Sequence, residues 1–314
     1  MLKSAVLTAF FLIVLTSYVL AADQYSPPNR LTITGLPCYV TFRWPDDGSM
    51  YYLEVLASGR SVYSRPASGS SLTLSLPAND YRWKVRKFYN GEYHEITDFQ
   101  DFRVSADIAF SFNGSPGYQG ADGGMGSRGW VTMDGRRQYA NNGERGENGG
   151  NGSSGRDVTV ILEDSGDYLK VVITCETDVK ELYLSKSSRP LSISACGGRG
   201  GDGGSGGSGG VSDIVDRQEI YQKTLCPIAG DGGDGGNGGD GGKGGTVKVI
   251  SRGGDFSRFI EAAVSGGEAG KGGQAGTGGN LGGQSGYPGC SGKTGESGKV
   301  VIEAQQGNTG NQIH

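Results

Sequence analysis

The stretch from Gly266 to Gly298 reads GGEAGKGGQAGTGGNLGGQSGYPGCSGKTGESG, and it decides the fold. Glycine occupies every third position from 267 to 282 and, after a slip of one residue, every third position from 283 to 298. This period is typical of a left-handed extended helix with three residues per turn, because it leaves one edge without side chains. The slip beside Asn280 and Leu281 indicates a reversal between two rods, each roughly 50 Å long at about 3.1 Å per residue.

Glycine recurs with this period in two further pairs of runs. One pair covers 114–129 and 143–155, and the other consists of Gly-Gly-x triplets at 197–210 and 230–245. Six runs of similar length and constant phase favour a packed bundle of polyglycine-II rods, since a flexible linker needs neither property. A collagen triple helix is one alternative, although it requires far more proline than Pro116 and Pro288. Disorder is the other alternative, because glycine loses the most entropy on ordering.

Strand-like segments between the rods carry most aliphatic residues of the C-terminal two-thirds and are the candidates for its core. They are 158–162, 168–174, 180–184, 191–194, 246–251, 259–264 and 300–303. Each pair of rods begins and ends beside such a segment, so we expect three rod hairpins to project from a basal β-sheet. The inserts 130–142 and 211–229 would then meet at the far tip, next to the turn at Asn280.

The N-terminus predicts export. Residues 1–22 combine an early lysine, an apolar run and a small-residue end, as a secretory signal peptide does, and 23–30 read as a polar linker. No other apolar stretch is long enough to span a bilayer, so we expect no membrane span after signal cleavage and a secreted or cell-surface protein. The formal net charge of −4 argues against a nucleic-acid partner.

Residues 31–106 have the composition of an all-β module, with strand-like runs separated by turn residues. The runs are 31–34, 39–44, 51–57, 72–76, 81–87 and 99–105. Phe42-x-Trp44-Pro45, Tyr51-Tyr52-Leu53, Leu72-x-Leu74-x-Leu76 and Tyr81-Arg82-Trp83 follow one another in the order that resembles a bacterial fibronectin type III domain. That resemblance implies a β-sandwich in which Trp44 and Trp83 are core residues.

The second part, 107–314, is predicted to be the glycine-rich bundle with interleaved strands, which makes the whole chain all-β with essentially no α-helix outside the signal peptide. Rods joined by variable inserts resemble the glycine-rich tip adhesins of tailed phages, and valine-rich strands alternating with Gly-Gly-x runs resemble bacterial collagen-like glycine-rich proteins. The first resemblance implies recognition loops between the glycine-rich runs. The signal peptide is not usual in a phage tail protein.

The sequence offers little for catalysis. Its two histidines, His94 and His314, cannot form a His-based triad or a histidine metal cluster, and Tyr287 replaces the first glycine of a phosphate loop. Asp231, Asp234 and Asp240 would be about 9 Å or more apart along a rod, too far to share an ion, and a solvated edge is expected there. We therefore predict no enzyme activity, no catalytic residue, no cofactor and no metal.

Five cysteines in an exported chain suggest disulfides with one thiol left over. Cys175 and Cys196 both fall in the expected basal sheet, and they are the predicted pair.

The inserts are the predicted site of recognition, since aromatic and arginine side chains are enriched at binding surfaces. The candidate residues are Trp130, Arg136, Arg137, Tyr139, Arg217 and Tyr221. The expected function is a non-enzymatic, adhesin-like surface protein with a surface carbohydrate or a protein as its ligand. Alternatively, Trp130 and Tyr221 only cap the open end of the bundle. Ice binding, as in antifreeze proteins built from six polyglycine helices, and a matrix or cell-wall structural role are the other functions considered.

A packed bundle predicts slow amide exchange in the rods, because N–H groups paired between rods exchange only when the rods separate. Hydrogen exchange should show protection throughout 197–210 and 230–245. Random-coil rates in either segment would contradict the bundle and favour disorder.

Overall fold

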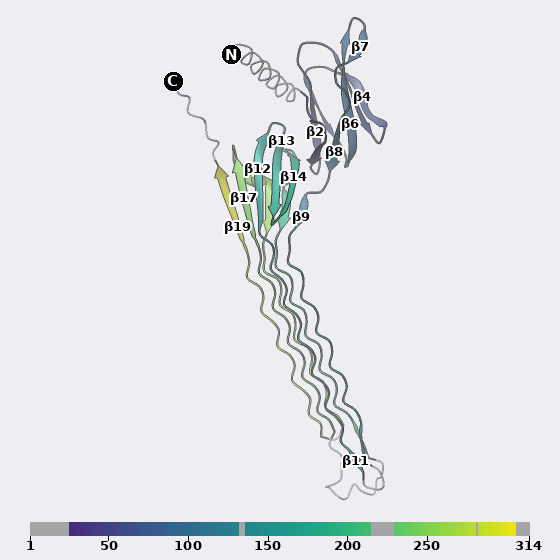
Figure 1. Cartoon of the computed structure of the whole chain (residues 1–314), viewed down its shortest axis with the longest axis vertical. Coiled ribbons are helices and arrows are strands. Elements are labelled where there is room, and N and C mark those ends of the chain that lie inside the picture. Colours follow the sequence, from purple (N-terminus) through teal and green to yellow (C-terminus); the bar gives the residue numbers. More distant parts are fainter. Residues whose placement is uncertain (1–24, 132–135, 215–228, 281, 306–314) are drawn as a thin grey trace, which may run out of the picture.

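The structure, a computed structural model, describes residues 25–131, 136–214, 229–280 and 282–305. These residues form strands, extended rods and turns, with one short 3-10 turn at Ser257–Phe259 and no α-helix in the described ranges. A β-sandwich lies at one end, a strand-rich base follows it, and a long bundle of rods leads from the base to a small sheet at the far end (Figure 1). The all-β class agrees with the sequence prediction.

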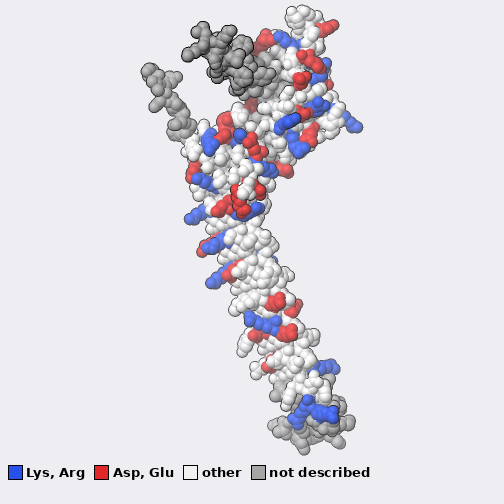
Figure 2. All heavy atoms as spheres, viewed as in Figure 1, with Lys and Arg blue, Asp and Glu red and all other residues white. Residues whose placement is uncertain are grey.

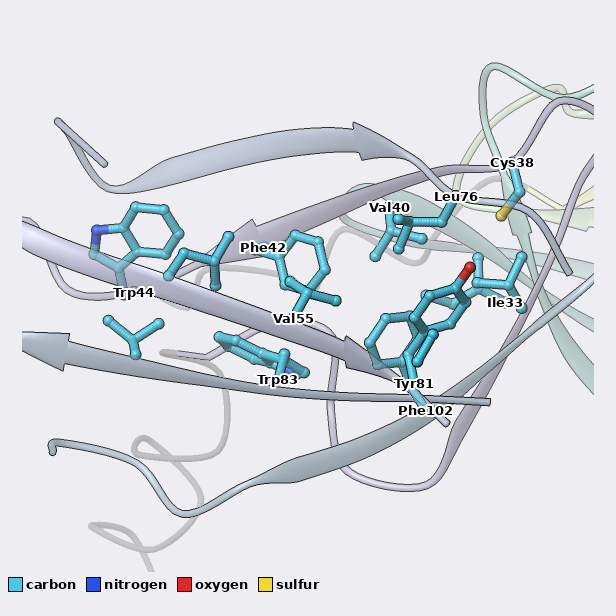
Figure 3. Packing of buried hydrophobic residues seen from close by; sticks show 14 of the residues in the cluster. Ile33, Cys38, Val40, Phe42, Trp44, Val55, Leu76, Tyr81, Trp83 and Phe102 are labelled. Carbon is cyan, nitrogen blue, oxygen red and sulfur yellow. The ribbon is translucent and has the colours of Figure 1, made fainter. Parts of the chain in front are cut away.

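The sandwich places a pair of strands, β2 and β5, opposite a larger sheet that contains β4, β3, β6, β8 and β1. The bounds are β1 Leu31–Thr34, β2 Tyr39–Arg43, β3 Tyr51–Ala57, β4 Arg60–Ala67, β5 Ser71–Ser75, β6 Asn79–Tyr89, β7 Glu92–Glu95 and β8 Gln100–Ser105. Aromatic rings fill the space between the sheets (Figure 3). The ring centroids of Phe42 and Trp83 lie 5.3 Å apart, edge to face, and Trp44 and Trp83 are 2% and 0% exposed. The two tryptophans are core residues, as predicted.

Two strands of the sandwich were not expected from the sequence. β4 has an almost entirely exposed pattern because it is the edge strand, so it shows no apolar alternation. β7 is exposed throughout and exists because Asn90 and Gly91, with φ of 52° and 86°, make a two-residue turn that folds it back on β6. The expected linker also differs in part: Trp83 Nε1 donates to the Pro27 carbonyl at 3.2 Å, so this segment lies against the sandwich.

The sandwich and the base share one continuous sheet. β1 pairs in parallel with β8 on one side and with β14 (Asp178–Ser185) of the base on the other. Next to this junction, the Arg43 guanidinium donates to both carboxylate oxygens of Asp167 at 2.6 Å, and the Tyr168 side chain enters the sandwich core. The junction is therefore built from backbone pairing, an ion pair and apolar packing together.

The base consists of two stacked sheets. One continues from β14 through β13 (Tyr168–Cys175), β12 (Val158–Ser165), β17 (Thr246–Arg252) and β19 (Lys299–Gln305), and the other runs β9 (Ala109–Ser111), β15 (Leu191–Ser194), β18 (Ile260–Ala263). One apolar cluster takes side chains from both sheets, including Val160, Leu182, Ile193 and Val249. The predicted strand segments thus form a conventional core, and each rod starts or ends at it.

The six rods, numbered in chain order as 114–129, 143–155, 197–210, 230–245, 266–279 and 283–298, form two layers. Rods 1, 3 and 5 leave the base and lie side by side in parallel, with bonds such as Gly120 N to Asp202 O and Gly203 N to Lys271 O, both at 2.8 Å. Rods 2, 4 and 6 return in parallel in the second layer. Antiparallel bonds, such as Gly204 N to Glu147 O at 2.8 Å, join the two layers.

The number of neighbours explains how much glycine a rod contains. Rod 3 contacts rods 1, 2, 4 and 5, and a Cβ added at its Gly203 or Gly204 would lie 2.1 Å from Gly236 O or 1.9 Å from Ala121 O. Atoms cannot approach that closely, so two residues of each turn must be glycine. Rod 1 contacts only rods 2 and 3, and one glycine in each turn suffices there.

In many turns the third backbone N–H, which no carbonyl of another rod accepts, donates to a side chain of the neighbouring rod. An Asp or Asn at the exposed position uses its Oδ1 to accept the exposed backbone N–H of the next rod in the layer, as Asn148 does for Asn237 at 2.8 Å. In the second layer the acceptors are Asn142, Asn148, Asn151, Asp231, Asp234, Asn237 and Asp240. The expectation of a merely solvated edge at the three aspartates is thus incomplete, because they pair the backbone of rod 6 while remaining exposed.

Replacing Gly204 by alanine should destabilise the bundle by about 3 kcal/mol, at the upper end of overpacking costs, because the added Cβ would lie 1.9 Å from Ala121 O and 2.4 Å from the Ala121 carbonyl carbon, which are backbone atoms of rod 1. The neighbouring Ser205, at the exposed position of the same rod, offers a matched control as Ser205→Ala. Melting followed by circular dichroism should show a lower Tm for Gly204→Ala alone. Equal melting of the two variants would contradict the close packing.

Candidate functional site

The far tip joins two segments that are distant in the sequence. β10 (Gly129–Val131) pairs antiparallel with β11 (Arg137–Gln138) and parallel with β16 (Ser212–Ile214), so both long inserts contribute to one small sheet. The third hairpin also reaches it, since Ser212 N donates to Asn280 Oδ1 at 2.9 Å and Asn280 Nδ2 donates to Ser212 O at 3.1 Å. The predicted convergence of the inserts at the tip is therefore present.

The predicted site residues of the first insert are exposed. Trp130 and Arg137 lie on this sheet, and Arg136 and Tyr139 lie directly before and after β11. Trp130 is 38% exposed and Tyr139 is 58% exposed. Trp130 stands opposite Gln138, and Arg137 stands opposite Val131. Because directly opposite residues of a ladder share a face, Trp130 and Arg137 leave opposite faces of the ribbon. The structure thus brings the residues to one end of the molecule but not onto one face. Arg217 and Tyr221 lie outside the described residues.

Arginines gather at the tip, where Asp213 also stands in register with Trp130. Arg128, Arg136 and Arg137 lie within it, and Figure 2 shows their end of the rod bundle in blue beside residues that are drawn in grey. Along the rods the charges alternate in sign, as in the pairs Arg199–Asp202 and Lys243–Glu296. Exposed pairs of this kind contribute little to stability. Arginine and exposed aromatic side chains at one end of a molecule suit hydrogen bonding to anionic or hydroxyl groups and ring stacking, here from different faces of the ribbon.

A second exposed aromatic group, which the sequence analysis missed, lies at the opposite end of the molecule. Tyr93 of β7 packs against Tyr52 and Phe88 with ring centroids 5.2 and 5.0 Å apart, and Met50, whose sulfur accepts from the Tyr93 hydroxyl at 3.6 Å, is 54% exposed. The Arg86 guanidinium covers the Tyr52 ring at 4.7 Å. The Asn90-Gly91 turn was the sequence signal that could have predicted the hairpin carrying this group.

A cleft of about 620 Å³ lies at the junction of sandwich and base, lined by Tyr25, Tyr168 and Tyr183 among others. Arg43 and Asp167 also line this cleft, and they form an ion pair with each other. Burial is the main cause that raises the pKa of the Tyr168 hydroxyl, which bonds the backbone N–H of Thr41 at 2.9 Å. These groups hold the junction together, and nothing in them resembles a nucleophile paired with a base.

The predicted disulfide is absent from the structure, where Cys175 and Cys196 are both free thiols. Cys175 is buried in the core of the base at 2% exposure. The Cys196 sulfur instead contacts the hydroxyls of Ser265 at 3.2 Å and Ser194 at 3.5 Å, which lower the pKa of its thiol. Placement of both residues in the base was correct, but the two side chains have different surroundings.

In the described ranges, no three His, Cys, Asp or Glu side chains are grouped closely enough to hold a metal ion. Within the same ranges, no helix is long and apolar enough to cross a membrane. The predicted signal peptide, 1–22, lies outside the described residues.

Comparison with known proteins adds little. No family model matches this chain, and no curated protein matches it. Three chains among the solved structures match, and one belongs to a study of Clostridium thermocellum CbhA fibronectin(III)-like modules. It aligns with 51% of this chain and 90% of its own length at 9% identity, with a TM-score of 0.22. That value is too low to carry an argument, so the description of the sandwich depends on its own strands and core.

The thiols predict distinct reactivities. Burial raises the pKa of Cys38 to about 12, so this group remains a neutral thiol near pH 8, whereas Cys290 is exposed on rod 6. We expect iodoacetamide to alkylate Cys290 at least roughly tenfold faster than Cys38 in the native chain, as measured by peptide mass spectrometry. Equal rates in urea would serve as the control. Fast labelling of Cys38 in the native chain would contradict its burial.

Proposed function

We propose that this chain is an exported, non-enzymatic binding protein in which a rigid rod bundle carries a recognition surface away from the sandwich and base. One observation carries the proposal: the inserts 130–142 and 211–229, far apart in sequence, both contribute strands to one sheet at the end of the rods. Trp130 and Arg137 of that sheet, and Tyr139 directly after β11, are exposed side chains of the kind enriched at binding hot spots.

In the proposed mechanism, the rods present the recognition surface at a distance from the base. The rods are joined by backbone bonds along their whole length, so they resist bending and hold the tip at a fixed distance from the base. Aromatic side chains can stack on the apolar faces of sugar rings or of protein side chains, and the arginines can donate to hydroxyl, carboxylate or phosphate oxygens. The proposed ligand is accordingly a surface carbohydrate or a protein. Resemblance to phage tip adhesins belongs to this proposal as an analogy of architecture alone.

Ice binding is an alternative function, and the exposed faces of the rods would be the surface that binds ice. Its requirement is a flat face of small or methyl-bearing residues, whereas the faces here include Arg199, Asp202, Glu268 and Lys271. A matrix or cell-wall structural role would use the rods without the tip.

Replacing Trp130 and Tyr139 by alanine should weaken attachment to a cell surface or a glycan array at least about tenfold, because each aromatic anchor removed costs more than about 1 kcal/mol. Met125, which is 80% exposed on rod 1 close to the tip, provides a control as Met125→Ala. Arg136→Ala and Arg137→Ala should weaken attachment mainly at low salt.

Attachment and melting temperature, measured together, distinguish a tip that binds a ligand from a tip that only caps the bundle. Lost attachment with an unchanged melting temperature supports a binding tip, whereas a lower melting temperature with attachment retained shows that Trp130 only closes the bundle. Thermal hysteresis in the wild-type chain that survives the tip substitutions would favour ice binding by the rod faces instead.

A further inference from the structure

The large sheet of the base ends at β19, and no described strand pairs with the outer side of that strand. β19 is the last strand of the order β19-β17-β12-β13-β14, with the sandwich at the other end of the sheet (Figure 1). It contains Val300, Val301 and Ile302 in succession, which are 44%, 37% and 59% exposed. A seven-residue apolar edge strand without proline attracts another strand, and proteins usually cover or charge such edges.

The register with β17 shows which side chains of β19 face the core. Val300 and Ile302 are level with Val247 and Val249, which are 0% and 1% exposed. Partners in register share a face of the sheet, so Val300 and Ile302 point to the core side, yet they remain exposed. The core of the base is therefore incomplete at this edge.

The same register shows which backbone groups are free. Lys299 N donates to Gly245 O, and Gln305 O accepts from Gly253 N, so these two odd-numbered residues direct their polar groups towards β17. Because polar groups alternate along a strand, those of Val300, Ile302 and Ala304 point to the open edge. The free groups are thus spaced symmetrically about Ile302.

We propose that a second copy of the chain pairs at this edge, β19 against β19, antiparallel and centred on Ile302. In this register Ile302 bonds with Ile302 of the second copy, and Val300 pairs with Ala304 of the second copy. All six outward N–H and C=O groups of each strand are then paired. A two-fold axis normal to the sheet keeps the four core-facing valine and isoleucine side chains on one side, where they complete the apolar surface.

Charge and shape favour a second copy over an unrelated strand. Lys299 lies diagonally across from Glu303 of the second copy, so no like charges stand opposite each other on the outer face. Antiparallel pairing also directs the two rod bundles away from each other. Both tips remain accessible, which would give a bivalent protein.

Pairing at β19 does not depend on what the tip binds, and it determines the mass of the protein in solution. Sedimentation equilibrium of the mature chain should give twice the mass of one chain. Ile302→Pro removes an N–H that points to the open edge and leaves the pairing with β17 intact, so its melting temperature should stay close to wild type. We expect this variant to raise the dimer Kd by roughly tenfold or more, since the central hydrogen bonds and apolar contact are lost.

Cysteine cross-linking tests the register, in a background with Cys290→Ser, which removes the exposed thiol among the described residues, and Cys226→Ser, which removes the cysteine outside them. Ile302→Cys should give a disulfide-linked dimer on mild oxidation, because opposite residues of a hydrogen-bonded pair have Cα atoms about 5.5 Å apart. Val300→Cys, exposed on the same face, is the matched control and should not cross-link, since Ala304 stands opposite it. A monomeric wild-type chain, a dimer that survives Ile302→Pro, or cross-linking of Val300→Cys in place of Ile302→Cys would each overturn the proposal.

Discussion

The distal part of this protein depends on backbone hydrogen bonds between rods that pack without side chains between them. Glycine N–H groups donate to carbonyls of adjacent rods, mostly at 2.8 Å, and an added Cβ would approach neighbouring backbone oxygens to about 2 Å. Each glycine costs more conformational entropy on ordering than any other residue. Here that cost is offset along the whole rod by regular pairing with rods of both layers, which is why the bundle needs length and constant phase rather than an apolar core.

Position in the bundle sets the composition of each rod. The two central rods have four neighbours and carry Gly-Gly-x triplets, whereas rod 6 contacts only rods 4 and 5 and carries a single glycine in most turns. Rod 5 tolerates residues other than glycine on one side. Alanine replaces glycine at Ala269 and Ala275, on the side that faces rod 6. Next to these alanines the bonds Gly292 N to Gly270 O and Gly286 N to Gly276 O are 3.0 Å, slightly longer than the 2.8 Å of Gly289 N to Gly273 O.

The base supplies what the rods lack, an apolar core that fixes which rod lies beside which. Rods 2, 4 and 6 continue directly into β12, β17 and β19, and these strands lie side by side in parallel register. The same sheet reaches the sandwich through β1 and β14, so force applied at the tip passes through continuous backbone pairing to the N-terminal domain. The proposed presentation of a tip at a distance needs such a junction.

The sequence by itself determined the periodic features. The three-residue phase of glycine predicted the rods and their lengths, the slips and inserts predicted three hairpins, and alternation in segments such as 51–57 predicted most strands, because each of these follows from local repetition. It also determined that Trp44 and Trp83 are core residues.

Tertiary structure alone decided what local repetition cannot encode. The roles of Asn148 and Asp234 as acceptors for the next rod depend on which rods become neighbours. The opposite faces of Trp130 and Arg137 depend on strand register, and the free thiols of Cys175 and Cys196 depend on packing around each sulfur. The open edge at β19 exists because the sheet ends there, a fact set by the order of strands in space and not by the residues of β19 themselves.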